Sequence, residues 1–263
     1  MWQELKYALR LSEHVKQITL KYFEFQNPYS EAFQEYNELT YRAYIRDVVI
    51  DRPSYSDLTN DQKYLHDLGG LIAPVLSAYR IRGRIPRLKP RTYHITASAR
   101  LEECGQLLAM DAFHFKERIR LFGKSASLII MNAKRRSEFQ SEIGRVVRNY
   151  SHANKRLMKY RNFVVHGPEG RIDEFADLRN WQLSGLLLHN DLWLDYNNEF
   201  ELLRTEWASL AKELIQAMER GTSEIHLMNE NLIETSAFGF TNSANTCRLG
   251  NNFNGTIEAR RAE

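Results

Sequence analysis

The chain has 263 residues, of which 43% are hydrophobic and 26% are charged, and its formal net charge is +3. It contains no run of eighteen apolar residues, so the sequence predicts no membrane-spanning helix. Its only cysteines, Cys104 and Cys247, lie far apart, which argues against a disulfide framework and fits a cytoplasmic protein. Because the net charge is small, the distribution of charge along the chain is the better indicator of a nucleic-acid partner.

The N-terminal part is expected to be helical. Apolar residues between Ala8 and Phe25 recur at alternating steps of three and four, the spacing of one buried helical face. Further helices are expected near 30–50 and 60–80. Residues 81–96, IRGRIPRLKPRTYHIT, contain two prolines and a glycine, which a helix interior tolerates poorly. This segment is therefore predicted to form an extended connection.

The same connection is strongly basic. Between Arg80 and Arg91 it contains six basic residues and no acidic one. Two compatible interpretations stay open. The segment is an arm that contacts RNA, or it is an exposed loop that packs Ile81, Ile85 and Leu88 against the rest of the protein.

A long helix is expected around 101–122, where the apolar residues from Leu101 to Phe122 keep helical spacing. Gly123-Lys124-Ser125 follows and is similar to the end of a phosphate-binding loop. That motif needs a glycine at position 118, where this chain has Arg118. A turn at the start of the next helix is predicted instead.

The helix expected over 125–166 carries two stripes between Glu142 and His166. The apolar stripe consists of Val146, Tyr150, Ala153, Leu157, Tyr160 and Val164. The polar stripe consists of Arg145, Arg148, His152, Lys155, Lys159, Asn162 and His166. On one straight helix these stripes occupy roughly opposite sides. No Asp or Glu occurs from Arg145 to His166, so the polar stripe is either a surface for phosphates or an ordinary solvated face.

The end of this helix holds the candidate site. Gly167-Pro168 should stop the helix, which places His166 in or just after the last turn. Asn162, four residues earlier, shares the face of His166. Arg161 lies about 140° away around an ideal helix, so the two side chains do not meet easily. Either the helix ends before His166, or a second copy of the chain completes the pocket.

The segment Arg161-Asn162-x-x-x-His166, followed by glycine, resembles the R-x(4–6)-H signature of the HEPN superfamily. The arginine-to-histidine spacing also occurs from Arg87, Arg145 and Arg220. Only Arg161 is followed by a polar residue, however, and only His166 is followed by glycine. The resemblance implies a compact all-α helical bundle, commonly a homodimer, with a HEPN-like domain over residues 1–220. It also implies a toxin or antiviral effector with an antitoxin or defence-system partner.

The resemblance further implies a metal-independent endoribonuclease that needs no cofactor. His166 would act as general acid or base on the ribose 2′-hydroxyl or the leaving 5′-oxygen, giving a 2′,3′-cyclic phosphate. Arg161 would bind the scissile phosphate, and Asn162 would orient the histidine or a phosphate oxygen. The residues that would extend the RNA path are Arg148, His152, Lys155 and Lys159.

Other interpretations stay open. The chain is alternatively a non-catalytic helical module that binds RNA, a nucleotide or a protein. It is also compatible with a structural subunit whose basic stripe meets an acidic partner. In a purely structural interpretation, Arg161 pairs with a neighbouring carboxylate and His166 caps carbonyl groups at the helix end. The histidines show no metal-ligand spacing, so no metal site is expected.

The C-terminal third is expected to contain helices near 172–195 and over 200–217. The acidic residues Asp173, Glu174 and Asp177 should favour the N-terminus of the first of these helices, or should act as partners of Arg161. From Gly221 to residue 263 the chain is rich in Asn, Ser, Thr and Gly, and it is predicted to form a loosely ordered tail. A short hairpin around 224–240 is the alternative.

Overall fold

The computed structural model describes residues 9, 10, 13, 55–90, 96–167, 173–187 and 192–234. The elements of these ranges are helices: η2 (Tyr55–Asp57), α3 (Asn60–Gly70), α4 (Ile72–Arg84), η3 (Ile85–Arg87), α5 (Thr96–Ile129), α6 (Ala133–Ala153), α7 (Lys155–His166), α8 (Ala176–Leu187) and α9 (Leu192–Glu234). The predicted all-α bundle is confirmed for this part of the chain. The helices expected over 8–25 and 30–50 lie almost entirely outside the described residues.

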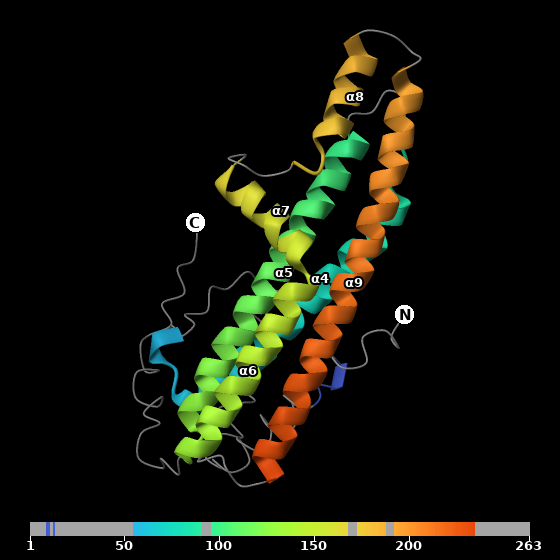
Figure 1. Ribbon diagram of the computed structural model, residues 1–263. Helices are drawn as coiled ribbons and strands as arrows, with labels where there is room; N and C mark the ends of the chain where they lie inside the picture. Colours follow the sequence, from blue (N-terminus) through green and yellow to red (C-terminus); the bar gives the residue numbers. More distant parts are fainter. Residues whose placement is uncertain are drawn as a thin grey trace, which may run out of the picture.

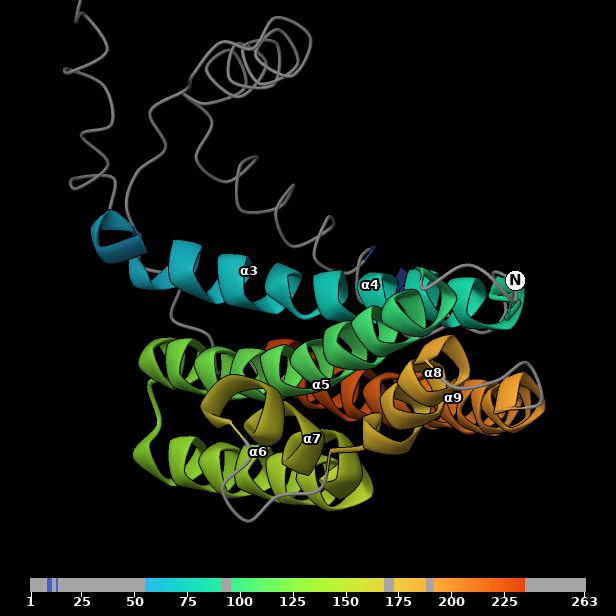
Figure 2. The same ribbon diagram turned by 90° about the horizontal axis from the view of Figure 1, so that it is seen from above.

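Two long helices, α5 and α9, run through most of the length of the bundle (Figure 1). The α3–α4 pair lies against one side of α5, and α6 and α7 lie on the other side (Figure 2). α4 also packs on α9, as does α6, and α8 forms an antiparallel hairpin with the N-terminal half of α9. α5 and α9 therefore separate the α4 layer from the α6–α7 layer.

The core follows the apolar spacing that the sequence shows. The predicted face of α5 from Leu101 to Phe122 is buried throughout, and so is most of the corresponding face of α9. At the centre, the Trp207 ring of α9 packs on Tyr160 of α7 and on Phe175, with ring centroids 5.2 and 5.3 Å apart. Trp193 is also buried, whereas Trp181 on α8 is 37% exposed. The burial of these apolar side chains is the main contribution to the stability of the bundle.

The prediction of an extended connection over 81–96 is wrong for its first part. α4 continues to Arg84, and the 3-10 helix η3 follows without a gap. Pro86 lies in the first turn of η3, where a missing N–H costs no hydrogen bond. Ile81 and Ile85 are buried, so packing against the bundle holds these turns helical. The chain becomes extended only at Leu88.

The predicted start of the tail at Gly221 is also wrong, because α9 continues to Glu234. A Cβ at position 221 would lie 3.2 Å from the Phe115 ring of α5, so a glycine here lets the two helices approach. Ile225 and Met228 extend the buried face beyond it. The hairpin alternative fails for the same stretch, and the remainder of the expected tail lies outside the described residues.

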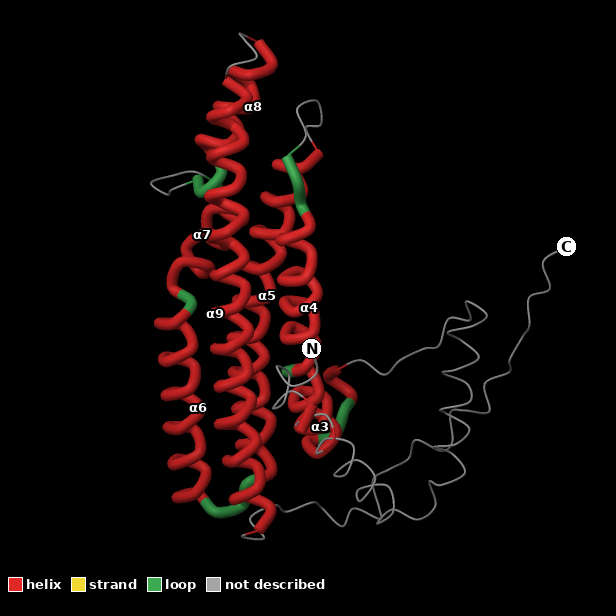
Figure 3. Tube along the Cα trace, turned by 90° about the vertical axis from the view of Figure 1, so that its right-hand side faces the viewer, coloured by secondary structure: helices red, strands yellow, loops and turns green. Residues whose placement is uncertain are grey.

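The segment expected to form one helix over 125–166 is divided among three. Gly123-Lys124-Ser125 lies inside α5 rather than in a turn, and the Ser125 hydroxyl donates to the Phe122 carbonyl at 3.1 Å. The first turn comes after Ile130, whose carbonyl accepts two hydrogen bonds from the Arg136 guanidinium. A second break falls at Asn154, between α6 and α7 (Figure 3). Only the second break falls within the candidate site.

Candidate RNA-binding and catalytic site on α6 and α7

Asn154 bends the chain in the middle of the predicted site. It is buried, its backbone leaves helical geometry at φ −109° and ψ 27°, and its side-chain amide donates to the Tyr150 carbonyl at 3.0 Å. Asparagine competes in this way with the helical hydrogen-bond ladder. As a result α7 leaves the line of α6 (Figure 1), and the predicted continuous stripes are divided between two helices. The single straight helix expected over Glu142 to His166 is therefore wrong.

The basic residues that the sequence singled out are nevertheless all exposed. We call the four of them, Arg148 and His152 on α6 and Lys155 and Lys159 on α7, the α6–α7 basic face. None of the four forms an ion pair with a residue that the structure describes. By contrast, Arg145 of the predicted stripe lies 3.6 Å from Glu224 of α9. The three cations, Arg148, Lys155 and Lys159, and the His152 ring are therefore available to an anionic partner.

The inner sides of the two helices match the predicted apolar stripe with one exception. Val146, Tyr150, Leu157 and Tyr160 are buried and Val164 is partly buried against the core, whereas Ala153 at the end of α6 is exposed. The Tyr150 hydroxyl donates to the Ala112 carbonyl of α5 at 3.0 Å, and burial raises the pKa of that hydroxyl. Burial likewise raises the pKa of Tyr160. These contacts fix α6 and α7 on α5 with their cations turned outward.

α7 ends as predicted, at His166. Gly167 has φ 82°, a left-handed conformation that a side chain would strain, and its N–H donates to the Phe163 carbonyl at 2.9 Å. His166 is itself the last helical residue and is exposed, with Asn162 exposed on the same face one turn earlier. A helix that ended before His166 was one of the two expected ways to bring His166 to Arg161. Because α7 includes His166, this way is absent.

Arg161 lies on a different side of α7, against α5. Its guanidinium carbon is 4.0 Å from the centre of the Phe113 ring, a cation–π contact. One of its terminal nitrogens donates to the Asn162 side-chain oxygen at 3.2 Å. Its Nε is buried and has no hydrogen-bond partner. No carboxylate among the described residues pairs with Arg161.

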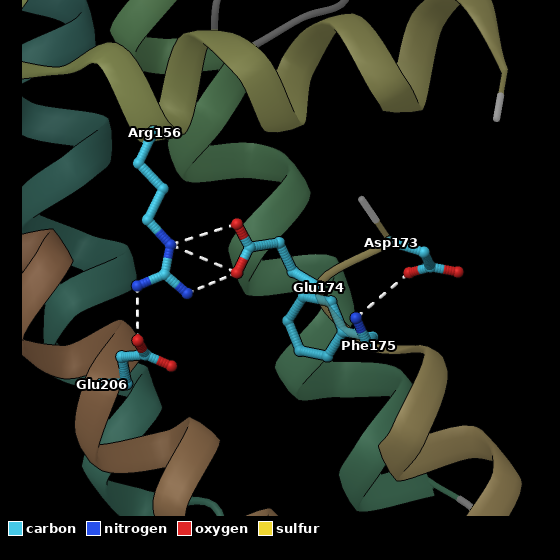
Figure 4. A network of polar contacts seen from close by, with 5 residues as sticks. All are labelled: Arg156, Asp173, Glu174, Phe175 and Glu206. Carbon is cyan, nitrogen blue, oxygen red and sulfur yellow. Dashed lines mark hydrogen bonds and ion pairs between the residues drawn. The ribbon is translucent and has the colours of Figure 1, made fainter. Parts of the chain in front are cut away.

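The acidic residues after the motif are occupied elsewhere. Glu174 receives three hydrogen bonds from Arg156 of α7, and a fourth links Arg156 to Glu206 of α9 (Figure 4). The hydrogen bonds that Arg156 donates to Glu174, and then the one that it donates to Glu206, raise the pKa of Arg156. Asp173 pairs with Arg179 and accepts a hydrogen bond from the Phe175 N–H at 3.1 Å (Figure 4).

Asp177 lies in the first turn of α8, where a negative charge favours the helix dipole, as predicted. The alternative expectation, that one of these acids pairs with Arg161, is not met by any of the three. Sequence reasoning did not identify two residues of this region. Phe113 comes from α5, and Arg156 is joined to a carboxylate fifty residues away. Neither the contact of Phe113 with Arg161 nor the ion pair of Arg156 with Glu206 could be predicted from residue spacing along the chain.

Within one chain, then, the structure assembles an exposed surface of basic residues and the end of a helix that carries an exposed histidine. It does not bring Arg161 into contact with His166. Among the residues that the structure describes, there is no group of three His, Cys, Asp or Glu that could hold a metal ion. No helix in the same ranges is long and apolar enough to cross a membrane.

No protein-family model, no curated protein and no solved structure matches this chain. The HEPN resemblance therefore rests on the segment Arg161–Gly167 and on the all-α context around it. The chemistry of the α7 end has to be argued from its own geometry.

Proposed function

We propose that this protein is a metal-independent endoribonuclease of the HEPN type that acts as a homodimer. The observation that carries the proposal is the C-terminal end of α7. There an arginine without a carboxylate partner, an exposed asparagine and an exposed histidine follow a surface of unpaired cations. The resemblance to HEPN effectors makes a toxin or antiviral role, with an antitoxin or defence-system partner, part of the same proposal.

The α6–α7 basic face supplies the binding step. Three exposed cations without ion pairs attract the phosphates of a single strand and release counterions when it binds, and the exposed His152 lies among them. Asn162 and His166 continue this line on α7, since they follow Lys155 and Lys159 on its outward side. An RNA strand bound along the face reaches His166 at the end of the helix.

The cleavage step uses His166 and Arg161. His166 accepts the proton of a ribose 2′-hydroxyl while the 2′-oxygen forms a bond to the adjacent phosphorus. The bond from phosphorus to the 5′-oxygen breaks, and the His166 of the second copy donates a proton to that oxygen. Arg161 donates hydrogen bonds to the non-bridging oxygens, where negative charge develops. The products carry a 2′,3′-cyclic phosphate and a 5′-hydroxyl.

A homodimer is proposed because Arg161 and His166 of one chain lie on different sides of α7. Arg161 and His166 lie on one unbroken helix, about 140° apart around its axis, so one copy does not present both to the same phosphate. A second copy placed against the α7 end brings its own His166 to the first copy's Arg161.

The test is cleavage of labelled RNA in the presence of EDTA by purified wild-type protein, His166→Ala and Arg161→Ala. We expect cleavage by the wild type, with cyclic-phosphate ends, and a loss of about a hundredfold or more in each variant. Arg220→Ala is the matched control, because Arg220 is an exposed helical arginine six residues before His226. Cleavage that survives both substitutions at the α7 end would disprove the site.

A second candidate function is a non-catalytic RNA-binding module. The observation that favours it is the Arg161 guanidinium, which is already stacked on Phe113 and bonded to Asn162. In that case wild-type protein binds RNA without cutting it. Affinity then falls when the α6–α7 basic face is neutralised and stays unchanged in His166→Ala. The same binding and cleavage assays separate the two functions.

A further inference from the structure

A second group of cations lies outside the site described above, on the end of α4 and on η3. Arg80, Arg84 and Arg87 are exposed, and we call them the α4–η3 basic face. Ile81, Ile85 and Leu88 follow each of them by one residue and turn inward, the first two buried and the third half-buried against the core. With the inward side of each turn fixed, the three arginines share the outward side.

The α4–η3 basic face is continuous and rigid. A rise of 1.5 Å per residue separates Arg80 from Arg84 by roughly 6 Å along the axis, and η3 continues directly to Arg87. Lys89, also exposed, follows. Arg204 of α9 holds this end of the chain in place by donating to the carbonyls of Pro86 and Leu88, at 3.3 and 3.0 Å.

None of the three arginines of this face forms an ion pair with a residue in the described ranges. Glu201, a nearby acid, pairs with Arg204. Burial raises the pKa of Cys104, and the smaller opposing effects of Glu103 and Arg84 on that thiol place Glu103 near this face, where it forms no ion pair with Arg84. The dipole of α4 favours the basic residues in its last turn, Arg82 and Arg84. It does not explain Arg80 one turn earlier or Arg87 beyond the helix. The fold thus leaves two of the three without a structural role.

The chemistry of this face favours a polyanion strand over a membrane. Peripheral binding to a bilayer combines basic residues with apolar side chains that enter the interface. Here the apolar side chains of the segment point into the core, and no large hydrophobic residue of 72–90 is exposed. Guanidinium groups spaced along one side of a helix instead fit the successive phosphates of a nucleic acid.

We infer that the α4–η3 basic face is a second RNA-binding surface, on the side of the bundle opposite the α6–α7 basic face. The two lie in different layers, with α5 and α9 between them (Figure 2). A long RNA that passes around the bundle contacts both faces, whereas a short oligonucleotide occupies one at a time. This inference rests on the proposed RNA function and extends it from cleavage to capture of the substrate.

The experiment measures binding of labelled polyuridylate by fluorescence anisotropy at several salt concentrations. All proteins carry His166→Ala so that the RNA stays intact. The test variant is Arg80→Gln/Arg84→Gln/Arg87→Gln. The matched control, Lys124→Gln/Lys212→Gln/Arg220→Gln, removes the same charge from exposed positions of α5 and α9. A third variant, Arg148→Gln/Lys155→Gln/Lys159→Gln, reports on the α6–α7 basic face.

We expect the test variant to bind long RNA about tenfold more weakly at low salt. The slope of log affinity against log salt should fall by about 2, since each phosphate contact on a single strand contributes about 0.7. The control should keep the wild-type slope. Circular dichroism of each variant shows whether its helices are intact, because exposed substitutions of this kind rarely disturb folding.

Equal affinity and slope in the test variant and the control would overturn the second surface. If the α6–α7 variant still loses affinity in that case, the proposed function stands. Loss in the test variant alone, with the α6–α7 variant unaffected, would support the second surface and contradict the proposed RNA path. The protein could instead bind vesicles of phosphatidylcholine and phosphatidylserine, in a way that requires Arg80, Arg84 and Arg87, and fail to bind RNA. This result would indicate a membrane as the partner of this face and would overturn the inference.

Discussion

The two ends of α7 carry arginines with opposite surroundings. At the N-terminal end, Arg156 is held by Glu174 and Glu206, so its charge joins α7 to the segment before α8 and to α9. At the C-terminal end, Arg161 rests on an aromatic ring and has a buried Nε without an acceptor. A buried donor without a partner costs free energy that folding alone does not recover. The difference teaches that the first arginine serves the fold, and we propose that the second is placed for a ligand.

The largest expected effect concerns His166. His166→Ala should lower RNA cleavage about a thousandfold, because it removes the proposed general acid and base, while stability stays the same since the side chain is exposed. Initial cleavage rates and a urea unfolding curve measure the two quantities. If His166→Ala lost activity only as far as it lost stability, His166 would be a structural residue. The C-terminal end of α7 would then not differ from the N-terminal end.

A mixing experiment tests how Arg161 and His166 meet. Arg161→Ala and His166→Ala should each lower the cleavage rate by about a hundredfold or more. The first loses contacts to the phosphate, and the second loses proton transfer. A mixture that has exchanged subunits should regain part of the activity, because a mixed dimer places one intact arginine beside one intact histidine, although it lacks the second histidine that protonates the leaving 5′-oxygen. Activity in the mixture no higher than in either variant would show that the site does not form across two copies.

The next effect belongs to the other end of the helix. Arg156→Ala should lower the free energy of unfolding by about 2 kcal/mol, allowing for solvent screening of its partly exposed partners. Arg161→Ala, which breaks no ion pair, should lower it by less than about 1 kcal/mol. Urea denaturation compares the two directly. Equal losses would mean that Arg161 is as structural as Arg156.

The smallest effect concerns Phe113. Phe113→Leu removes the ring under Arg161 and should cost about 1 kcal/mol of cation–π energy, so we expect cleavage to fall about fivefold. Phe113→Tyr keeps the ring and should restore the rate. If the leucine variant cleaves like the wild type, the ring does not position Arg161.

Much of the fold was predictable because helical spacing is a local property. The buried faces of α5 and α9, and the end of α7 before Gly167, follow from side-chain periodicity and from glycine's tolerance of positive φ. The wrong boundaries arose where packing outweighs local preference. Gly221 continues a helix because Phe115 lies against it, and Pro86 begins a 3-10 turn because Ile85 is buried.

For the candidate site, the sequence by itself determined which residues are cationic, which share a helical face and where α7 stops. Only the tertiary structure decided that Asn154 divides the basic stripe and that Phe113 lies beneath Arg161. It alone showed that Glu174 and Glu206 belong to Arg156. The physical reason is range. Spacing and capping act within a few residues of the chain, whereas ion pairs and ring contacts join elements that only the packed bundle brings together.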